Sequence, residues 1–459
     1  MPTDLRSPRV WVGLVFLAFA FLAGRLDLPT FGYAGVLLVT VAVGVYLLVT
    51  GRPPILVIWL GCLVGFAVAC PQVLGILRGL PIDVGQLVFG VAIAVAAWAA
   101  AVVPPRLVRW SVLGVLAAVV WSGLAAGFSA LIGVVGYGLF AVPGHDRDAF
   151  GIGQLRGVMP HPNTMGLFAG LALVLAYRQV LTDVRRQRRR AWGIALAVAL
   201  PAAVALTWSQ SRTSAVATVA GLVVASLPLR RRGTGWLSLV AALGAVAMIV
   251  APVVVARATD YDFNGRSLAW QYATQEFAHA PVLGYGPGFF STGYWASYPG
   301  LEWFPVNAHN LVMQAGGQSG VVGLAALTAA IAVMAIVAVR TPRWDWQWAL
   351  IVFVMFCVLG GQEATLSIPV RSGVVLTVAV LASSVMLRQQ GLRSQGRGSQ
   401  AGGSQAGGLQ ATTDGSPLPD GSPLPDGWSL PDGSADGSSL PDGSPLPDGS
   451  AGESSGGAP

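Results

Sequence analysis

The sequence predicts an all-α polytopic membrane protein with about 12 transmembrane helices, both termini in the cytoplasm (N-in/C-in) and a large extracytoplasmic loop. Of the 459 residues, 54% are hydrophobic and only 10% are charged, whereas a typical soluble domain has about 25% charged residues. This scarcity of charge excludes an ordinary cytosolic enzyme. All 27 basic residues are arginines, which excludes mechanisms that need a lysine nucleophile or a Schiff base.

Apolar runs long enough to cross a bilayer recur along the first 388 residues. A hydrocarbon core of about 30 Å needs about 20 apolar residues, and fewer where Trp or Arg flanks the helix. We read the first run as a retained helix, because no small-x-small cleavage site precedes Arg25. The stretch 131–142 could extend the fifth helix, form a short re-entrant piece or make a thirteenth span. The predicted spans are 10–24, 31–50, 54–70, 84–103, 110–130, 164–181, 191–208, 212–228, 235–255, 319–339, 346–361 and 372–387.

The arginines divide unequally between the two sides of these spans. With the N-terminus inside, 19 arginines fall in inner segments and eight in outer segments, as the positive-inside rule requires. The densest runs, 185–190 and 230–232, are inner and act as topology anchors that could also contact membrane lipid. We expect no nucleic-acid partner, and we expect a multi-pass protein of the cytoplasmic (inner or plasma) membrane.

Two segments differ from the spans. The outer segment 256–308 has 53 residues, is rich in Tyr and Trp, and is expected to be ordered, with a short helix near 265–278. Residues 389–459 are rich in Gly, Ser, Pro and Asp and repeat SPLPDG at 416–421, 422–427 and 444–449. Such a composition buries too little apolar surface to offset its ordering entropy. We therefore divide the chain into a transmembrane domain, 1–388, and a disordered cytoplasmic tail, 389–459, whose role in partner binding stays open.

Outer arginines are the first candidates for chemistry, because an arginine at membrane depth persists where it faces a cavity or a counter-charge. Arg212 lies in WSQSRTSA at the outer end of a span. It could bind an anion in a polar pocket between helices, or it could snorkel to the interface. Arg156 precedes His161-Pro162-Asn163, where a helix is expected to start with Asn163 as its N-cap. A helix N-terminus also favours anions, although capping alone explains Asn163.

The segment 256–308 contributes another arginine and a Gly-rich turn. Arg266 opens the predicted short helix and Pro281 stops it. The helix would contact the membrane or the core through Leu268, Trp270, Tyr272 and Phe277. A tight turn follows at Gly284, Gly286 and Gly288. This turn does not follow a strand of a βαβ unit, so a dinucleotide site is excluded.

The strongest candidate is the block Asn307-Ala308-His309-Asn310, which is followed by Gly320-x-x-Gly323. His309 is one of only four histidines and falls at the outer mouth of the next span. An imidazole, which ordinarily titrates near pH 6.5, suits a general base. A lone histidine can equally be structural. The three cysteines form no CxxC or Cys/His cluster, so we expect no metal site.

The order of these motifs resembles the O-antigen ligase and O-antigen polymerase family. The HPN helix start, the SR at the head of a later span, the R-x3-W…P-x-LGYGPG loop and the His-Asn, nine residues, Gly-x-x-Gly block follow one another as in that family. The resemblance covers roughly residues 150–340 and does not cover the tail. The block from His309 to Gly323 is its most specific part.

The resemblance implies a membrane glycosyltransferase that needs no metal and no cofactor and that serves polysaccharide biosynthesis in the cell envelope. Such enzymes move a glycan from a polyprenyl diphosphate carrier to an acceptor hydroxyl on the extracytoplasmic face. His309 would be the catalytic base, and Arg212 and Arg266 would bind the diphosphate, with Arg156 and Arg371 behind them. The residues that would shape the site are His161, Asn163, Gly284, Gly286, Asn310, Gly320 and Gly323.

Two alternative functions and the identity of the acceptor stay open at this point. The chain could be a polymerase of lipid-linked repeat units, which has the same fold and chemistry as a ligase. The acceptor could be a glycan, a lipid or a protein. A multi-pass transporter or flippase would favour paired repeats and acidic residues at the membrane midplane. Here Asp83 and Glu363 lie near the outer ends of spans, and no paired repeat is evident among the predicted spans, which favours the transferase.

Overall fold

In the computed structural model, the described residues are 7–23, 29–134, 141–142, 151–185, 189–227, 235–259, 266–290, 308–340, 347–363 and 372–386. The predicted tail, Arg371, Asn307 and the basic run 230–232 lie outside these residues. The same is true of the side chains of the run 185–190.

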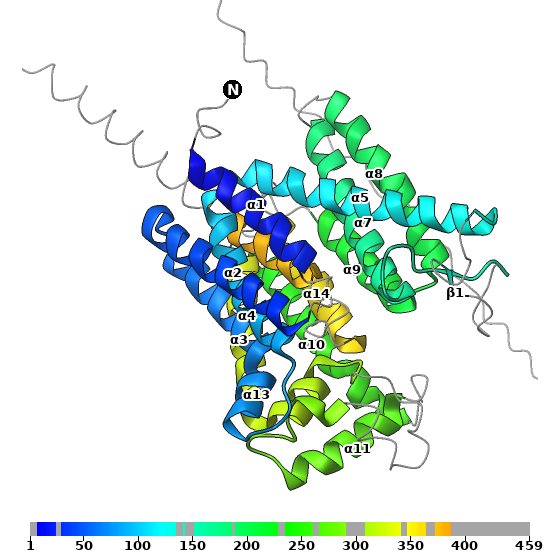
Figure 1. Ribbon diagram of the computed structural model, residues 1–459. Coiled ribbons are helices and arrows are strands. Elements are labelled where there is room, and N and C mark those ends of the chain that lie inside the picture. Colours follow the sequence, from blue (N-terminus) through cyan, green and yellow to red (C-terminus); the bar gives the residue numbers. More distant parts are fainter. Residues whose placement is uncertain are drawn as a thin grey trace, which may run out of the picture. The chain divides into compact units, whose positions relative to one another are not determined.

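The described part of the chain is almost entirely helical (Figure 1). Its helices are α1 (Pro8–Ala23), α2 (Thr30–Gly51), α3 (Ile55–Leu77), α4 (Val84–Val102), α5 (Pro105–Leu131), α7 (Pro162–Arg185), α8 (Arg189–Ser209), α9 (Arg212–Ser226), α10 (Gly235–Thr259), α11 (Arg266–His279), α13 (Leu311–Val339), α14 (Trp348–Gln362) and the helix Ser372–Met386. A 3-10 helix, η2, covers Pro287–Phe290, and two short strands, β1 (Ala141–Val142) and β2 (Gln154–Leu155), pair antiparallel. The predicted all-α class is confirmed.

Each of the twelve predicted spans coincides with one of these helices. Eight are long and apolar enough to cross a membrane, namely α2, α3, α4, α5, α7, α8, α10 and α13. The other four, α1, α9, α14 and Ser372–Met386, have 15 or 16 residues, which at 1.5 Å per residue gives roughly 24 Å or less. The chain is therefore a multi-pass membrane protein, while the number of spans and the N-in/C-in topology stay predictions.

Two expected helix boundaries were wrong. The span predicted to start at 319 belongs to α13, which begins at Leu311 and has a non-helical residue at Gly320. The residues just before the kink, 316–319, are buried by protein, so they need no lipid-like composition. The helix expected to start after an Asn163 cap begins at Pro162, because proline is favoured in the first helical turn.

The ambiguous stretch 131–142 is not a further helical span in its described part. Helix α5 ends at Leu131, residues 132–134 form a turn, and 141–142 pair with β2. Twelve apolar helical segments, rather than thirteen, thus remain in the described chain.

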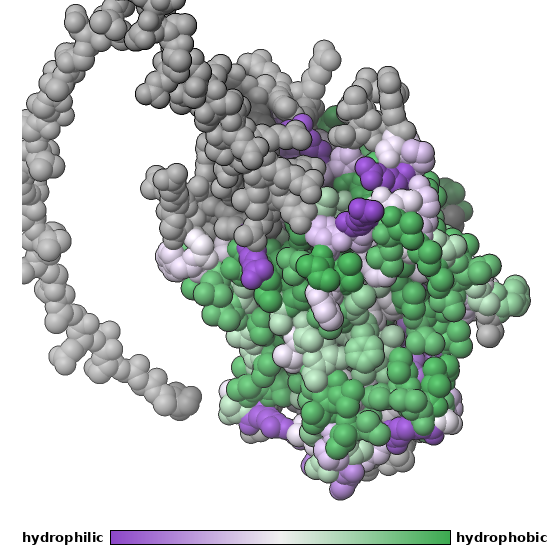
Figure 2. Space-filling view, turned by 90° about the vertical axis from the view of Figure 1, so that its left-hand side faces the viewer, coloured by the Kyte–Doolittle hydropathy of each residue, from purple (hydrophilic) through white to green (hydrophobic). Residues whose placement is uncertain are grey.

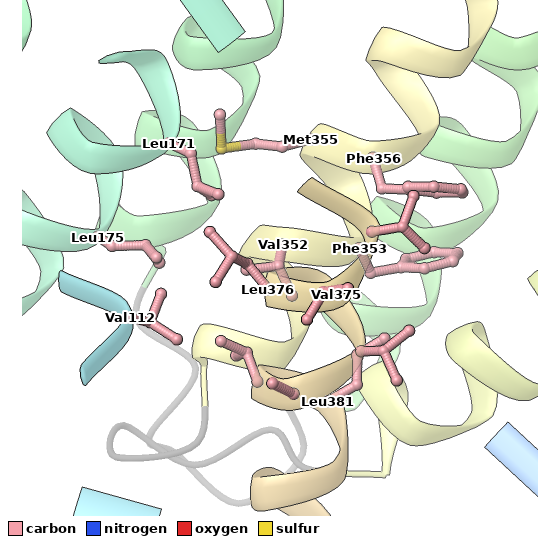
Figure 3. Close-up of a cluster of buried hydrophobic side chains, with 14 of the residues drawn as sticks. Val112, Leu171, Leu175, Val352, Phe353, Met355, Phe356, Val375, Leu376 and Leu381 are labelled. Atoms are coloured by element: carbon pink, nitrogen blue, oxygen red, sulfur yellow. The ribbon is translucent and has the colours of Figure 1, made fainter. Parts of the chain in front are cut away.

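The core lies around the two C-terminal helices. In α14 every residue from Trp348 to Gly361 is buried, although the helix is only 15 residues long. It contacts α7, α9, α10 and α13. Figure 3 shows side chains of α14 and of Ser372–Met386 meeting Leu171 and Leu175 of α7 and Val112 of α5. This packing places the C-terminal end of α14 beside α7, α10 and α13.

The surface has the distribution expected for a membrane. Figure 2 shows apolar residues over the middle of the visible face and hydrophilic residues gathered toward its top and bottom. Large apolar side chains that are exposed on the surface include Phe31 and Leu38 of α2 and Leu200 of α8. Lipid can cover such a belt, because the hydrocarbon core offers no penalty to apolar side chains.

Candidate active site

The carboxylate of Glu363, directly after α14, contacts side chains from three other elements. Its Oε2 lies 2.9 Å from Nδ1 of His309. Its Oε1 accepts a hydrogen bond from Nδ2 of Asn163 at 2.9 Å and lies 3.3 Å from Nη2 of Arg266. The side chains of His309, Arg266 and Glu363 are each about 15% exposed. The cluster is therefore largely enclosed by protein and keeps a small exposed surface.

His309 is held in an unusual backbone conformation. Its φ is +48°, in the left-handed region that few non-glycine residues adopt. Such a conformation costs about 1–3 kcal/mol and persists only where the surroundings determine it. It turns the chain directly before α13, where the imidazole contacts Glu363.

The next residue, Asn310, fixes the start of α13. Its Oδ1 accepts hydrogen bonds from the backbone N–H groups of Val312 and Met313, as an N-cap does. Its Nδ2 donates to the carbonyls of Ile249 in α10 and Gly361 in α14. One buried amide therefore ties the histidine-bearing turn to the same end of α14 that carries Glu363.

Arg266 is the first residue of α11 and holds the end of α14 through its guanidinium. Its Nη1 donates to the Gln362 carbonyl at 2.7 Å and lies 3.5 Å from Oε1 of Gln362, while Nη2 pairs with Glu363. A guanidinium has five N–H donors, and these contacts use at most three of them. An anionic ligand could accept hydrogen bonds from the N–H groups that make no contact with the described residues.

The surroundings of Glu363 favour its charged form. Burial by itself would raise the pKa of this carboxyl, but the hydrogen bond and charge of His309 and the charges of Arg266 and His161 outweigh it. The pKa of Glu363 is therefore lower than that of an ordinary glutamate, and the carboxylate is ionised at neutral pH.

At the start of α7, His161 takes the role that was expected of Asn163. Nδ1 of His161 accepts the backbone N–H of Asn163 at 3.1 Å, and this leaves the Asn163 side chain free to donate to Glu363. The Asn163 carbonyl accepts a hydrogen bond from Oγ of Ser214 in α9. The prediction of a polar helix start was right, but the residue that caps it is different.

Arg212 and Arg156 do not contact this carboxylate, whose described side-chain partners are Asn163, Arg266 and His309. Arg212 opens α9 two residues before Ser214, and its side chain is exposed. Ser209, Ser211 and Ser214 around it are buried and pack against Gly166 of α7. Arg156 directly follows β2 and is half-buried, and Arg371 is outside the described residues.

The Gly-rich turn packs into the kink of α13. The N–H groups of Tyr285 and Gly286 donate to the carbonyls of Gly317 and Gln318, and the N–H of Val321 donates to the Pro281 carbonyl. A Cβ on Gly284 would lie 2.5 Å from the Ser319 nitrogen, and a Cβ on Gly320 would lie 2.5 Å from the Val282 carbonyl.

Two side chains also hold the Gly-rich turn against the kink of α13. Nε2 of Gln318 donates to the Pro287 carbonyl, and Arg78 at the end of α3 donates to the Gly284 carbonyl. Gly323 lies one turn past the kink, where a Cβ would meet Ser319 and the Ala315 carbonyl. The expected glycines are thus structural parts of one junction between α11 and α13.

Among the described residues, no group of three or more His, Cys, Asp and Glu side chains could hold a metal ion. The cluster around Glu363 instead combines one carboxylate, one imidazole and one guanidinium. These groups can take up a proton and bind an anion.

A family model described as O-Antigen ligase matches residues 194–328. This stretch is a domain of the O-antigen ligase family. It runs from α8 into the second half of α13 and contains Arg212, Arg266 and His309, so the resemblance expected from the motifs is confirmed. None of the curated proteins compared matches the chain.

The O-antigen ligase domain does not contain two members of the cluster, Asn163 and Glu363. Sequence reasoning selected Asn163 but gave Glu363 no role. A signal was present, because the run that ends in GGQE leaves one carboxylate at the end of an apolar span, where charge is costly unless it is paired. The partners of this carboxylate lie 54, 97 and 200 positions away, so sequence proximity did not reveal them.

Proposed function

We propose that the chain transfers a glycan from a polyprenyl diphosphate carrier to an acceptor hydroxyl on the outer face of the cytoplasmic membrane. The observation that carries this proposal is the Glu363 carboxylate that joins His309 to Arg266, with both partners inside an O-antigen ligase domain. A base beside a cationic anion-binding group is what glycosyl transfer from a diphosphate needs.

His309 is the base in this proposal, and Glu363 is its positioning residue. With Nδ1–H donating to Glu363, Nε2 carries the lone pair that accepts the proton of the acceptor hydroxyl. The acceptor oxygen then bonds to the anomeric carbon of the donor sugar, while the bond from that carbon to the diphosphate oxygen breaks. The electron pair of the broken bond leaves with the diphosphate.

Arginines stabilise this leaving group. Guanidinium groups bind phosphate oxygens bidentately and stay charged at all relevant pH values, so they can offset the charge that develops on the diphosphate. Arg266 is linked to His309 through the Glu363 carboxylate that both contact. Arg212, on the exposed start of α9, is the second ligand, and Arg156 and Arg371 complete the set.

The proposed face and topology follow from the arginine distribution. The segments that carry Arg266 and His309 are outer segments when the dense basic runs are inside. A lipid-linked donor would then present its diphosphate at the outer interface, with the polyprenyl chain among the apolar helices.

Reconstitution of the purified protein tests the proposal. In detergent micelles with a chelator, a polyprenyl-diphosphate-linked glycan and candidate glycan, lipid or protein acceptors, we expect release of polyprenyl diphosphate together with a new glycoside. Elongation of the donor glycan itself would identify a polymerase, and transfer to another acceptor a ligase. Movement of the donor across liposomes without any release of diphosphate would contradict the proposal and favour a transporter.

A further inference from the structure

The residue before the proposed base is held on both of its backbone polar groups by side chains. The Ala308 carbonyl accepts a hydrogen bond from Nε1 of Trp270 at 2.8 Å, and the Ala308 N–H donates to Oε1 of Gln314 at 2.8 Å. Ala308 is fully buried and Trp270 is 2% exposed. These bonds lie on the N-terminal side of His309, where the chain arrives from the outer segment.

The bond from Trp270 acts directly on the conformation of His309. The carbonyl of Ala308 and the N–H of His309 belong to one rigid peptide plane. Rotation of that plane changes φ of His309, which has the unusual value of +48°. A donor that fixes the carbonyl therefore fixes the direction in which the imidazole leaves the backbone.

The indole is itself well anchored. It packs with Val253 and Ala256 of α10 and with Met313 of α13. It also stands four residues after Arg266 on α11, and residues with this spacing lie on the same face of a helix. One short helix thus sets the positions of two groups around Glu363, Arg266 directly and His309 through Ala308.

We propose that Trp270 is a positioning residue for His309, acting through the hydrogen bond from its indole N–H to the Ala308 carbonyl. The proposal rests on the proposed role of His309 as base. Sequence reasoning gave Trp270 only a packing role against the membrane or the core, and the buried N–H donor adds a second one.

The decisive variant replaces Trp270 by benzothienylalanine, which keeps the bicyclic shape and loses the N–H. We expect kcat for transfer to fall about 10- to 100-fold, because small misplacements of a catalytic group have effects of this size. KM for the donor should stay unchanged within a few-fold. Trp270→Phe should likewise lower kcat and leave KM unchanged. 4-Fluorotryptophan, which keeps the N–H, should restore kcat. Wild-type kcat with benzothienylalanine would overturn the proposal.

A second measurement reads His309 without any turnover. The chain has four histidines, so ¹⁵N-histidine spectra of the full chain can be assigned with a His309 variant. We expect the Nδ1 resonance that reports the bond to Glu363 to shift when benzothienylalanine replaces Trp270. An unchanged resonance would contradict the positioning role, even if the proposed transfer reaction itself were wrong.

Trp348→Phe is the matched control. Trp348 is equally buried, at the opposite end of α14 from Glu363. We expect this variant to lose stability as Trp270→Phe does, while its kcat and its His309 resonance stay as in the wild type. An equal fall of kcat in both variants would assign Trp270 a packing role only.

Discussion

Glu363 shows how one side chain organises the proposed site. Its two carboxylate oxygens contact an imidazole, an amide and a guanidinium that come from the start of α13, from α7 and from α11. Because the carboxylate is enclosed, loss of its charge would leave Arg266 without its counter-charge, which is costly away from water.

Glu363→Gln should therefore lower the thermal stability in a pH-dependent way. Burial raises the pKa of Glu363, but His309, Arg266 and His161 outweigh it and hold the pKa below its ordinary value. The stabilisation from its charge is then fully present above the ordinary glutamate pKa of about 4.3. It is lost as pH falls through the lower native pKa. The difference in Tm between wild type and variant should be largest near pH 7 and shrink below about pH 4. A constant difference over this range would contradict the ion-pair assignment.

Arg266→Lys should reduce transfer about 100-fold, the usual cost of removing one donor to a developing charge. A lysine ammonium cannot bind the Gln362 carbonyl and Glu363 and still offer a planar fork to a diphosphate. Arg212→Lys should also be damaging, but less so, because Arg212 supports no internal contact among the described residues. Arg340→Lys, at the exposed end of α13, is the control and should keep its rate. Near-normal rates for both Arg266→Lys and Arg212→Lys would argue against a diphosphate clamp.

At the scale of single residues, the sequence identified the members of the cluster that stand in short motifs, namely Arg266, His309, Asn310 and the polar helix start at 161–163. It did not identify Glu363 as their partner or the hydrogen bond of Trp270. Both depend on contacts between segments that are far apart in the chain, and hydropathy treats Trp270 only as an apolar residue.

At the scale of elements, the junction between the Gly-rich turn and α13 sets how these two segments pack together. Gly320 interrupts α13 with φ 60° and ψ −148°, a region that essentially only glycine occupies. The break lets backbone groups at 281–286 pair with those at 317–321. Sequence periodicity placed the span start at 319, one residue from the kink, because the helical turns before it are polar and Gly-rich.

Gly320→Ala should destabilise the protein strongly. The strained backbone costs about 1–3 kcal/mol for a non-glycine residue, and the new Cβ would also meet the Val282 carbonyl. Thermal unfolding in micelles should show a lower Tm and the transfer rate should fall with it. Gly244→Ala, at an exposed helical position with nothing within 4 Å of the new Cβ, should be neutral or slightly stabilising. Equal Tm values for the two variants would refute the proposed constraint.

At the scale of the whole molecule, hydropathy predicted the helices well because lipid demands apolar side chains and internally bonded backbone. It predicted helix lengths less well. α14 is surrounded by other helices, so its 15 residues need not match the thickness of the bilayer. Composition cannot report which helices face lipid and which face protein. The positive-inside topology therefore stays a prediction, as does the outer location of the site.

The central claim is that His309 removes the acceptor proton in a glycan transfer reaction. The most direct test is the rate of polyprenyl diphosphate release and glycoside formation by purified His309→Ala, with His309→Asn as a companion because asparagine tolerates positive φ. General base catalysis contributes about 10²–10⁴-fold, so the transfer rate of both variants should fall by at least about 100-fold. Their expression, membrane insertion and monodispersity should stay as in the wild type. Transfer by folded His309→Ala at the wild-type rate would contradict the account.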